Sequence, residues 1–160
     1  MLNIRPYTKS DSKQVVNWLT DEKAFRLWCA DRFKSFPLTA QEFDSIYRNG
    51  SPLLGFIAED CGNVIGHLFM QQRENGICKF GLIIVDSTKR GHGYGGRMLE
   101  AAIEYAKTHL SAKKIILSVF EDNTSAYLCY KKLGFTENGN IVPIKIFGSQ
   151  KDYIELEKVL

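Results

Sequence analysis

The pattern of apolar and polar residues changes period in the middle of the chain. Three β-type runs, at 53–59, 64–71 and 77–85, are separated by the short polar sequences DCGN and ENG. Such tight turns join neighbouring antiparallel strands. The pattern therefore predicts a three-stranded antiparallel meander at the centre of the fold.

Helical patterns come before this meander. A short strand is predicted at 2–5, followed by a first helix capped by Ser10 or Asp11 and a second that opens at Asp21. The sequence TAQE at 39–42 is a capping box, in which each end side chain satisfies a backbone donor of the other. It predicts the start of a third helix.

The second half of the chain alternates between the two periods. Apolar residues at helical spacing predict a helix over 94–109, and a strand follows at 114–119. A helix is predicted at 123–133, and two extended runs at 142–147 and 153–156 end the chain. This order predicts an α/β fold with a mixed sheet.

Length and composition favour one domain covering residues 1–160. Of the 160 residues, 44% are hydrophobic and 24% are charged, which is ordinary for a globular protein. The formal net charge of +3 is too small to predict a nucleic-acid partner. The N-terminus lacks an apolar signal region, and no run is long enough to span a membrane. We expect neither a nucleic-acid nor a membrane partner.

The cysteines predict neither a metal site nor a redox motif. Cys29, Cys61, Cys78 and Cys129 are widely spaced, and no C-x-x-C pair occurs. Cys78 and Cys129 lie inside apolar patterns, where a free thiol behaves as a small hydrophobic group. We therefore expect a reduced protein in the cytoplasm.

A glycine-rich stretch, KRGHGYGGRML at 89–99, joins the third meander strand to the next helix. Glycines at a strand-to-helix junction let backbone N–H groups approach a phosphate, and the helix N-terminus adds partial positive charge. Counted from Gly91, the stretch fits the dinucleotide fingerprint G-x-G-x-x-G. Counted from Arg90, it fits a different phosphate cradle, [R/Q]-x-x-G-x-[G/A]. A glycine-rich turn without a ligand is the third alternative.

The dinucleotide interpretation has one point in its favour. Glu121 ends the next predicted strand, near the place of a ribose-binding acid. The fingerprint, however, normally opens a doubly wound parallel sheet, whereas here it follows an antiparallel meander with little chain remaining. The absence of Gly-Lys-Ser/Thr excludes a P-loop. An NAD enzyme is therefore the least favoured alternative.

Two segments together are similar to the GCN5-related N-acetyltransferases, the GNAT superfamily. They are GLIIVDSTKRGHGYGGRMLEAAIEYA, with Arg90, Gly93 and Gly95 at signature positions, and VFEDNTSAYLCYKKLGF. The second segment has the pattern N-x-x-A-x-x-x-Y-x-x-x-G-F, formed by Asn123, Ala126, Tyr130, Gly134 and Phe135. The resemblance covers nearly the whole chain. It implies a single-domain GNAT fold, with a mostly antiparallel mixed sheet flanked by helices.

The resemblance also implies acetyl-CoA as the acyl donor and no metal. Backbone groups of the glycine loop would hold the pyrophosphate, from residues Arg90, Gly91, His92, Gly93, Tyr94, Gly95 and Gly96. Backbone groups of Ile83 and Val85 would pair with the pantetheine arm like an added strand. Asn123 would hydrogen-bond that arm, or simply cap its helix, and Ala126 would leave room for it.

The resemblance implies one catalytic acid, whereas several residues are candidates for the catalytic base. Tyr130 is the expected general acid for the leaving thiolate, with a buried aromatic on a helix face as the alternative. For the base, His67 alternates with Ile65 and Phe69 and is a candidate, although a structural histidine is the competing interpretation. Weaker candidates for the base are Glu59, Glu121, Asp31 and a water relay.

The acceptor site is expected in the helices after the first strand. Trp28, Asp31 and Arg32 fall within one turn, where an aromatic and a carboxylate would receive a cationic amine and Arg32 an acid group. An ordinary amphipathic helix end is the alternative. The sequence thus favours a monomeric or homodimeric acetyl-CoA-dependent N-acetyltransferase that acetylates a small-molecule or peptide amine directly. The main alternative is a non-catalytic acyl-CoA-binding sensor of the same fold.

Overall fold

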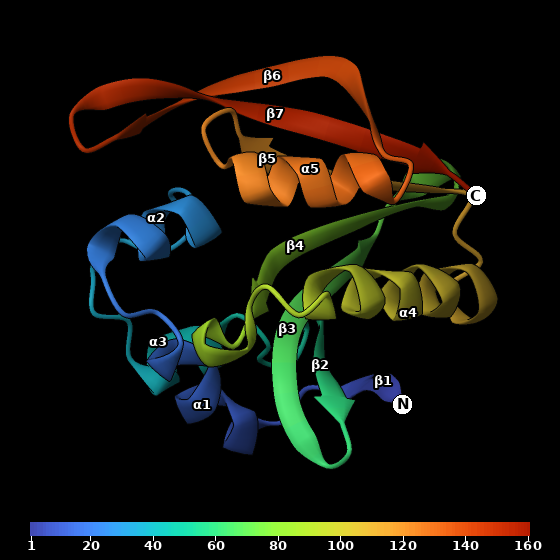
Figure 1. Ribbon diagram of the computed structural model, residues 1–160, viewed down its shortest axis with the longest axis horizontal. Helices are drawn as coiled ribbons and strands as arrows, with labels where there is room; N and C mark the ends of the chain where they lie inside the picture. Colours follow the sequence, from blue (N-terminus) through green and yellow to red (C-terminus); the bar gives the residue numbers. More distant parts are fainter.

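The computed structural model describes residues 1–160 and is built around one seven-stranded sheet (Figure 1). Its strands lie in the order β1-β2-β3-β4-β5-β7-β6. Their bounds are β1 Leu2–Pro6, β2 Leu54–Asp60, β3 Asn63–Gln72, β4 Ile77–Val85, β5 Lys114–Phe120, β6 Thr136–Ile146 and β7 Ser149–Val159. All neighbouring pairs are antiparallel except β4 and β5, which are parallel. The predicted mixed, mostly antiparallel sheet and its central meander are confirmed.

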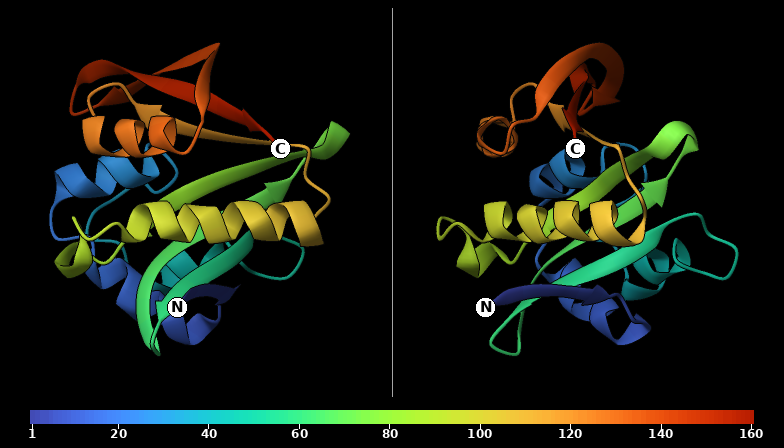
Figure 2. Two further views of the ribbon diagram at one scale, coloured as in Figure 1. Left: turned by 45° about the vertical axis from the view of Figure 1, so that its right-hand side comes forward. Right: turned by 90° about the vertical axis from the view of Figure 1, so that its right-hand side faces the viewer.

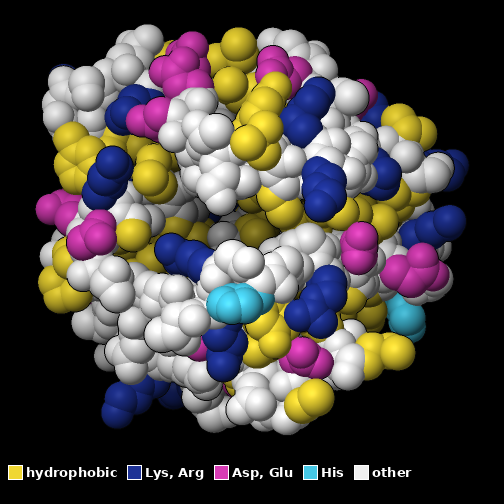
Figure 3. Space-filling view, in the orientation of Figure 1, with side chains coloured by type: hydrophobic (Ala, Val, Ile, Leu, Met, Phe, Trp, Pro, Cys, Tyr) yellow, Lys and Arg dark blue, Asp and Glu magenta, His cyan; other side chains and the backbone are white.

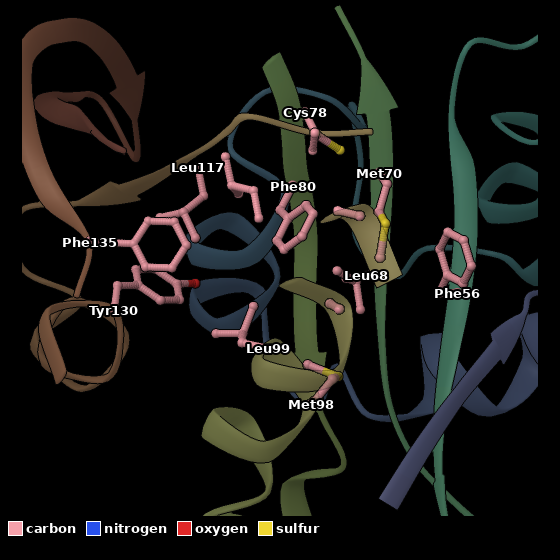
Figure 4. Packing of buried hydrophobic residues seen from close by; sticks show 14 of the residues in the cluster. Phe56, Leu68, Met70, Cys78, Phe80, Met98, Leu99, Leu117, Tyr130 and Phe135 are labelled. Atoms are coloured by element: carbon pink, nitrogen blue, oxygen red, sulfur yellow. The ribbon is translucent and has the colours of Figure 1, made fainter. Parts of the chain in front are cut away.

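The helices divide between the two faces of the sheet. They are α1 Ser12–Asn17, α2 Glu22–Cys29, α3 Ala40–Ser45, α4 Tyr94–His109 and α5 Thr124–Lys132. One core lies beneath α4 and α5 and includes Phe80, Met98, Leu117 and Phe135 (Figure 4). A second core, around Phe25 and Phe43, lies between the sheet and α1 to α3.

The parallel strands β4 and β5 separate soon after they pair. Their register covers only Ile77–Lys79 opposite Lys114–Ile116. Beyond Lys79, the edge of β4 that faces β5 has no strand partner. The sheet is therefore open at its centre, between the ends of these two strands.

A β-bulge in β4 lies directly in this open part. His67 pairs with Ile84 and Phe69 with Gly81, so β4 has one more residue than β3 between these pairs. Leu82 in the bulge has a φ of +48°, a left-handed conformation rare for a leucine. The extra residue exchanges the faces of the strand. Phe80 packs beneath α4, whereas Leu82 and Ile84 pack beneath α1 to α3.

The C-terminal hairpin is longer than its sequence predicts. β6 begins at Thr136, whereas the apolar pattern indicates a strand only from Val142. The segment 136–140, TENGN, is polar because β6 is an edge strand whose residues are mostly exposed. Figure 2 shows this hairpin at the end of the molecule opposite the N-terminus. None of the helices combines the length and the apolar character needed to cross a bilayer.

Candidate functional site

A cavity of about 470 Å³ occupies the opening between β4 and β5. Figure 3 shows a hollow on this face, with hydrophobic side chains on its floor and Lys and Arg side chains at its rim. Its walls come from α2, β4, the glycine loop, β5, α5 and β7. The lining residues are Leu19, Ala24, Leu27, Trp28, Phe80, Gly81, Leu82, Ile83, Ile84, Val85, Lys89, Arg90, Gly91, Gly93, Tyr94, Gly95, Gly96, Leu99, Ser118, Val119, Asn123, Ser125, Ala126, Cys129, Tyr130 and Tyr153.

At one end of the cavity, the glycine loop presents bare backbone. Gly91 and Gly93 have φ values of +80° and +77°, and Gly93 is the N-cap of α4. No side chain caps this 16-residue helix, so its first N–H groups are free to bind an anion. A Cβ built on Gly91, Gly93 or Gly96 would meet no protein atom within 4 Å. The space in front of these three glycines is therefore open.

The charged side chains of the cavity lie at this same end. Lys89 and Arg90 are the only Lys, Arg, Asp, Glu or His residues in the lining. Arg90 is exposed, and its Nε donates a hydrogen bond to the carbonyl of Val85 at 3.3 Å. His92, expected to contribute backbone only, is exposed beside the cavity, with Nδ1 2.9 Å from the Arg90 carbonyl oxygen. The loop end is thus cationic.

The middle of the cavity is bounded by the open edge of β4 and by α5. Ile83 and Val85 lie on β4 beyond its last pair with β5. Asn123 precedes α5 without making a capping hydrogen bond, so helix capping does not use its side-chain amide. Ala126, one turn further on, also lines the cavity. These four residues line the same cavity.

Tyr130 projects from α5 into the same cavity. It packs beside Phe135, with ring centroids 6.2 Å apart, and its hydroxyl points away from Phe135 toward Leu99 and Phe80 (Figure 4). Burial raises the pKa of Tyr130 far above that of a free tyrosine. The phenol is therefore protonated at neutral pH.

Cys129 is a cavity residue that the sequence pattern did not reveal. Its thiol lies near Gly95, 3.9 Å from where a Cβ on that glycine would be. Burial raises the pKa of Cys129, so the thiol is held in its protonated form. A thiol of this kind is a poor nucleophile.

His67 lies outside the cavity. Its side chain is fully buried against Tyr47 and Phe43, and its two ring nitrogens contact the Leu82 carbonyl oxygen at 3.1 Å and the Tyr47 hydroxyl at 2.8 Å. Because the carbonyl only accepts, Nδ1 must donate to it, and Nε2 then accepts from Tyr47. Burial lowers the pKa of His67 to about 4. The geometry corrects the base role predicted from alternation, because both ring nitrogens contact protein groups and the side chain is not part of the cavity lining.

The residues expected around the acceptor are separated. Trp28 lines the cavity, but Asp31 and Arg32 do not. Asp31 is exposed in a neighbouring cleft beneath β6, and the Arg32 guanidinium lies over the Phe69 ring at 5.0 Å. α2 ends at Cys29, so the three residues do not share a helical turn. The predicted pairing of Trp28 with a carboxylate is therefore wrong.

Instead, this end of the cavity has aromatic and aliphatic walls. Trp28 of α2 lines this end, and its buried Nε1–H has no hydrogen-bond partner in the protein. Tyr153 of β7 lines the same cavity and packs on Phe120, with ring centroids 4.7 Å apart. Nothing in the short run 153–156 distinguishes Tyr153 from an ordinary strand residue. Its position follows only from the pairing of β7 with β5.

Together, the fold and cavity bring a cationic glycine loop, an unpaired strand edge and Tyr130 to one opening between two separating parallel strands. Residues 13–135 match the model of the Acetyltransferase (GNAT) family. The chain therefore belongs to the GNAT acetyltransferase family.

Curated relatives match over part of their length. The chain is 32% identical over 71 residues to the spermine/spermidine N(1)-acetyltransferase of Bacillus subtilis, covering 44% of this chain and 47% of that one. It is 35% identical over 82 residues to an L-amino acid N-acetyltransferase of Escherichia coli, covering 49% of this chain and 50% of that one. The chain thus spans about half the length of these relatives.

A solved structure matches nearly the whole chain. The spermidine N-acetyltransferase of Vibrio cholerae in complex with CoA and spermine superposes with a TM-score of 0.83 and 23% identity, covering 99% of this chain and 95% of that one. The same enzyme has also been solved as a dodecamer. At this identity the superposition shows a shared fold.

Proposed function

We propose that this protein is an acetyl-CoA-dependent N-acetyltransferase that transfers acetyl directly to the amine of a small molecule. One observation carries the proposal. A single cavity brings together an uncapped helix N-terminus, an unpaired strand edge and the protonated Tyr130. Family membership supports the same activity.

The glycine-loop end suits the pyrophosphate of coenzyme A. Backbone N–H groups from Arg90 to Gly96 and the dipole of α4 would bind its charge, with Lys89 and Arg90 adding cations. The open space before Gly91, Gly93 and Gly96 supports this, because phosphate oxygens must approach the backbone closely. The donor fits the residues present.

The open edge of β4 suits the pantetheine arm. Backbone groups of Ile83 and Val85 would pair with its amides like a neighbouring strand. The Asn123 amide, which makes no capping hydrogen bond, would contact the same arm from α5. A backbone N–H near Val85 would then stabilise negative charge on the thioester oxygen during transfer.

The His67–Leu82 hydrogen bond gives the strand edge its shape. The imidazole binds the carbonyl of the bulged residue, whose left-handed conformation carries strain. By fixing the bulge, His67 orients the backbone of Ile83 and Val85 without contacting a ligand. We therefore assign His67 as a positioning residue.

Two protons must move during transfer. Acetyl donation breaks the thioester C–S bond as the amine nitrogen bonds to the carbonyl carbon. Tyr130 holds a proton at its phenol oxygen and would give it to the departing sulfur. For the amine proton, no Asp, Glu or His lines the cavity. The amine therefore enters uncharged or loses its first proton to water, and the proton that its nitrogen releases as the amide forms would return through water to the Tyr130 oxygen.

Release of free CoA is the readout for the proposed reaction. Acetyl-CoA is incubated with the protein and a panel of amines, and CoA thiol release is followed together with thermal stabilisation by acetyl-CoA or NAD. We expect stabilisation by acetyl-CoA, none by NAD, and amine-dependent CoA release. Stabilisation by acetyl-CoA without release for any amine would support the non-catalytic sensor instead.

Cellular setting and assembly are further parts of the proposal. Four free cysteines suit a reducing compartment, and we propose the cytoplasm. We propose a monomer or homodimer, and light scattering of the purified chain tests it against the dodecamer known for the Vibrio cholerae enzyme.

A further inference from the structure

The end of the cavity remote from the glycine loop is uncharged. Its walls are Leu19, Ala24, Leu27, Trp28 and Tyr153, from α2, the segment before it and β7. The two charged lining residues, Lys89 and Arg90, belong to the opposite end and are both cations. The nearby carboxylate of Asp31 faces a different cleft.

This distribution disfavours a polycationic acceptor. A polyamine retains at least one ammonium group after the reacting nitrogen has lost its proton, and a buried ammonium needs a carboxylate partner. The cavity offers none, and Lys89 and Arg90 repel additional positive charge. The uncharged walls instead favour an acceptor with a single amine on an apolar body.

The lack of a general base in the lining also distinguishes among acceptors that carry only one amine. A site without a proton acceptor in its lining favours the free-base form, whose share depends on the basicity of the amine. At pH 7.5, an α-amino group next to a carbonyl, of pKa about 7.8, is about one third uncharged. An alkylamine with a lysine-like pKa of about 10.4 is uncharged in about one molecule in eight hundred. Weakly basic α-amino groups are therefore favoured more than a hundredfold, to order of magnitude.

We propose that the acceptor is the amine of a neutral α-amino carbonyl compound with an apolar side chain, such as an amino-acid amide, and not a polyamine. The inference rests on the proposed acetyltransferase activity and narrows it. Uncharged walls and the absence of a base in the lining each support it separately.

A comparison of defined amines tests this class. The value of kcat/KM is measured at pH 7.5 for L-phenylalaninamide, glycinamide and spermidine, with free CoA as the readout. The kcat/KM for L-phenylalaninamide should exceed each of the other two values by about tenfold or more. Glycinamide lacks the apolar side chain, and spermidine carries additional positive charge. An equal or higher value for spermidine would overturn the inference and leave the acetyltransferase activity intact.

Placing a carboxylate in the acceptor end should reverse the preference. Ala24 lines the cavity in the first turn of α2, where an acidic side chain suits the helix dipole. Relative to Ala24→Asn, Ala24→Asp should raise kcat/KM for spermidine by about tenfold. It should lower the value for L-phenylalaninamide or leave it unchanged. A matched pair at a second wall position, Leu27→Glu and Leu27→Gln, guards against a folding defect.

The controls separate the two levels of the proposal. Each variant is first checked for thermal stabilisation by acetyl-CoA. If the Asp and Glu variants bind acetyl-CoA but gain nothing with spermidine, this cavity end does not receive the acceptor and the inference fails. If no amine releases CoA from the wild-type protein, the proposed function fails and this inference with it.

Discussion

The two ends of the cavity are built in different ways. The loop end presents backbone: N–H groups of α4 and glycines without a Cβ. The proposed acceptor end presents side chains brought together from α2 and β7. Glycine spacing is visible in the sequence, whereas the meeting of Trp28 and Tyr153 depends on the order of strands across the sheet. Backbone sites can therefore be predicted from motifs, and side-chain sites need the fold.

Tyr130 lies between the two ends, and its removal gives the largest expected effect. In Tyr130→Phe the ring is kept, so binding of acetyl-CoA measured by calorimetry should change little. Loss of the acidic proton should lower kcat by about a hundredfold or more. An unchanged kcat would show that the phenol is only a packing group on α5.

A weaker effect is expected where the backbone itself binds. Gly93→Ala strains a backbone with φ of +77° and places a methyl group in front of the N-terminus of α4. We expect the dissociation constant for acetyl-CoA to rise about tenfold. Gly50→Ala is the matched control, because Gly50 has φ of +85° and equally open surroundings in a remote turn. Equal losses of affinity in both variants would attribute the effect to instability alone.

Substitution of His67 is expected to have the smallest effect on turnover. It should instead change how the free energy of unfolding depends on pH. The pKa of His67 is about 4 when folded and about 6.5 when unfolded, so the unfolded chain binds more protons between these values. The histidine therefore stabilises the fold fully above pH 6.5 and loses about 3 kcal/mol of stabilisation as pH falls to 4.

His67→Gln keeps hydrogen-bonding capacity but does not titrate. Urea unfolding across this pH range should show a steeper decline for the wild type than for the variant, with kcat/KM at pH 7.5 lowered only a few-fold. Loss of nearly all turnover in a folded His67→Gln protein would restore the histidine as a catalytic group.

The sequence predicted the fold well where local signals agree. The capping box at Thr39 is formed, with the Thr39 hydroxyl accepting from the Glu42 amide at 3.1 Å. The meander and both motif helices also match. The first part of β6 was missed because an exposed edge strand has no apolar alternation. Local pattern predicts an element only when one of its faces is buried.

His67 shows why the candidate site was harder to predict. Its alternation with Phe69 is correct, but both side chains face the core beneath α1 to α3, where the histidine packs against Phe43 of α3. Which face of β3 borders the cavity depends on how β4 and β5 diverge, and that divergence has no sequence signal. Cys129 was missed for a related reason. The sequence of a helix does not show which neighbouring element each of its side chains faces.

The central claim is direct acetyl transfer within this cavity, and mass spectrometry of a single turnover tests it. Protein in excess over acetyl-CoA is mixed with L-phenylalaninamide, and the masses of the amine and of the intact protein are measured at successive time points. We predict one acetyl group on the amine and an unchanged protein mass at every time point, since Cys129 is held protonated. Acetylated protein appearing before acetylated amine, or intact acetyl-CoA after long incubation, would contradict this account.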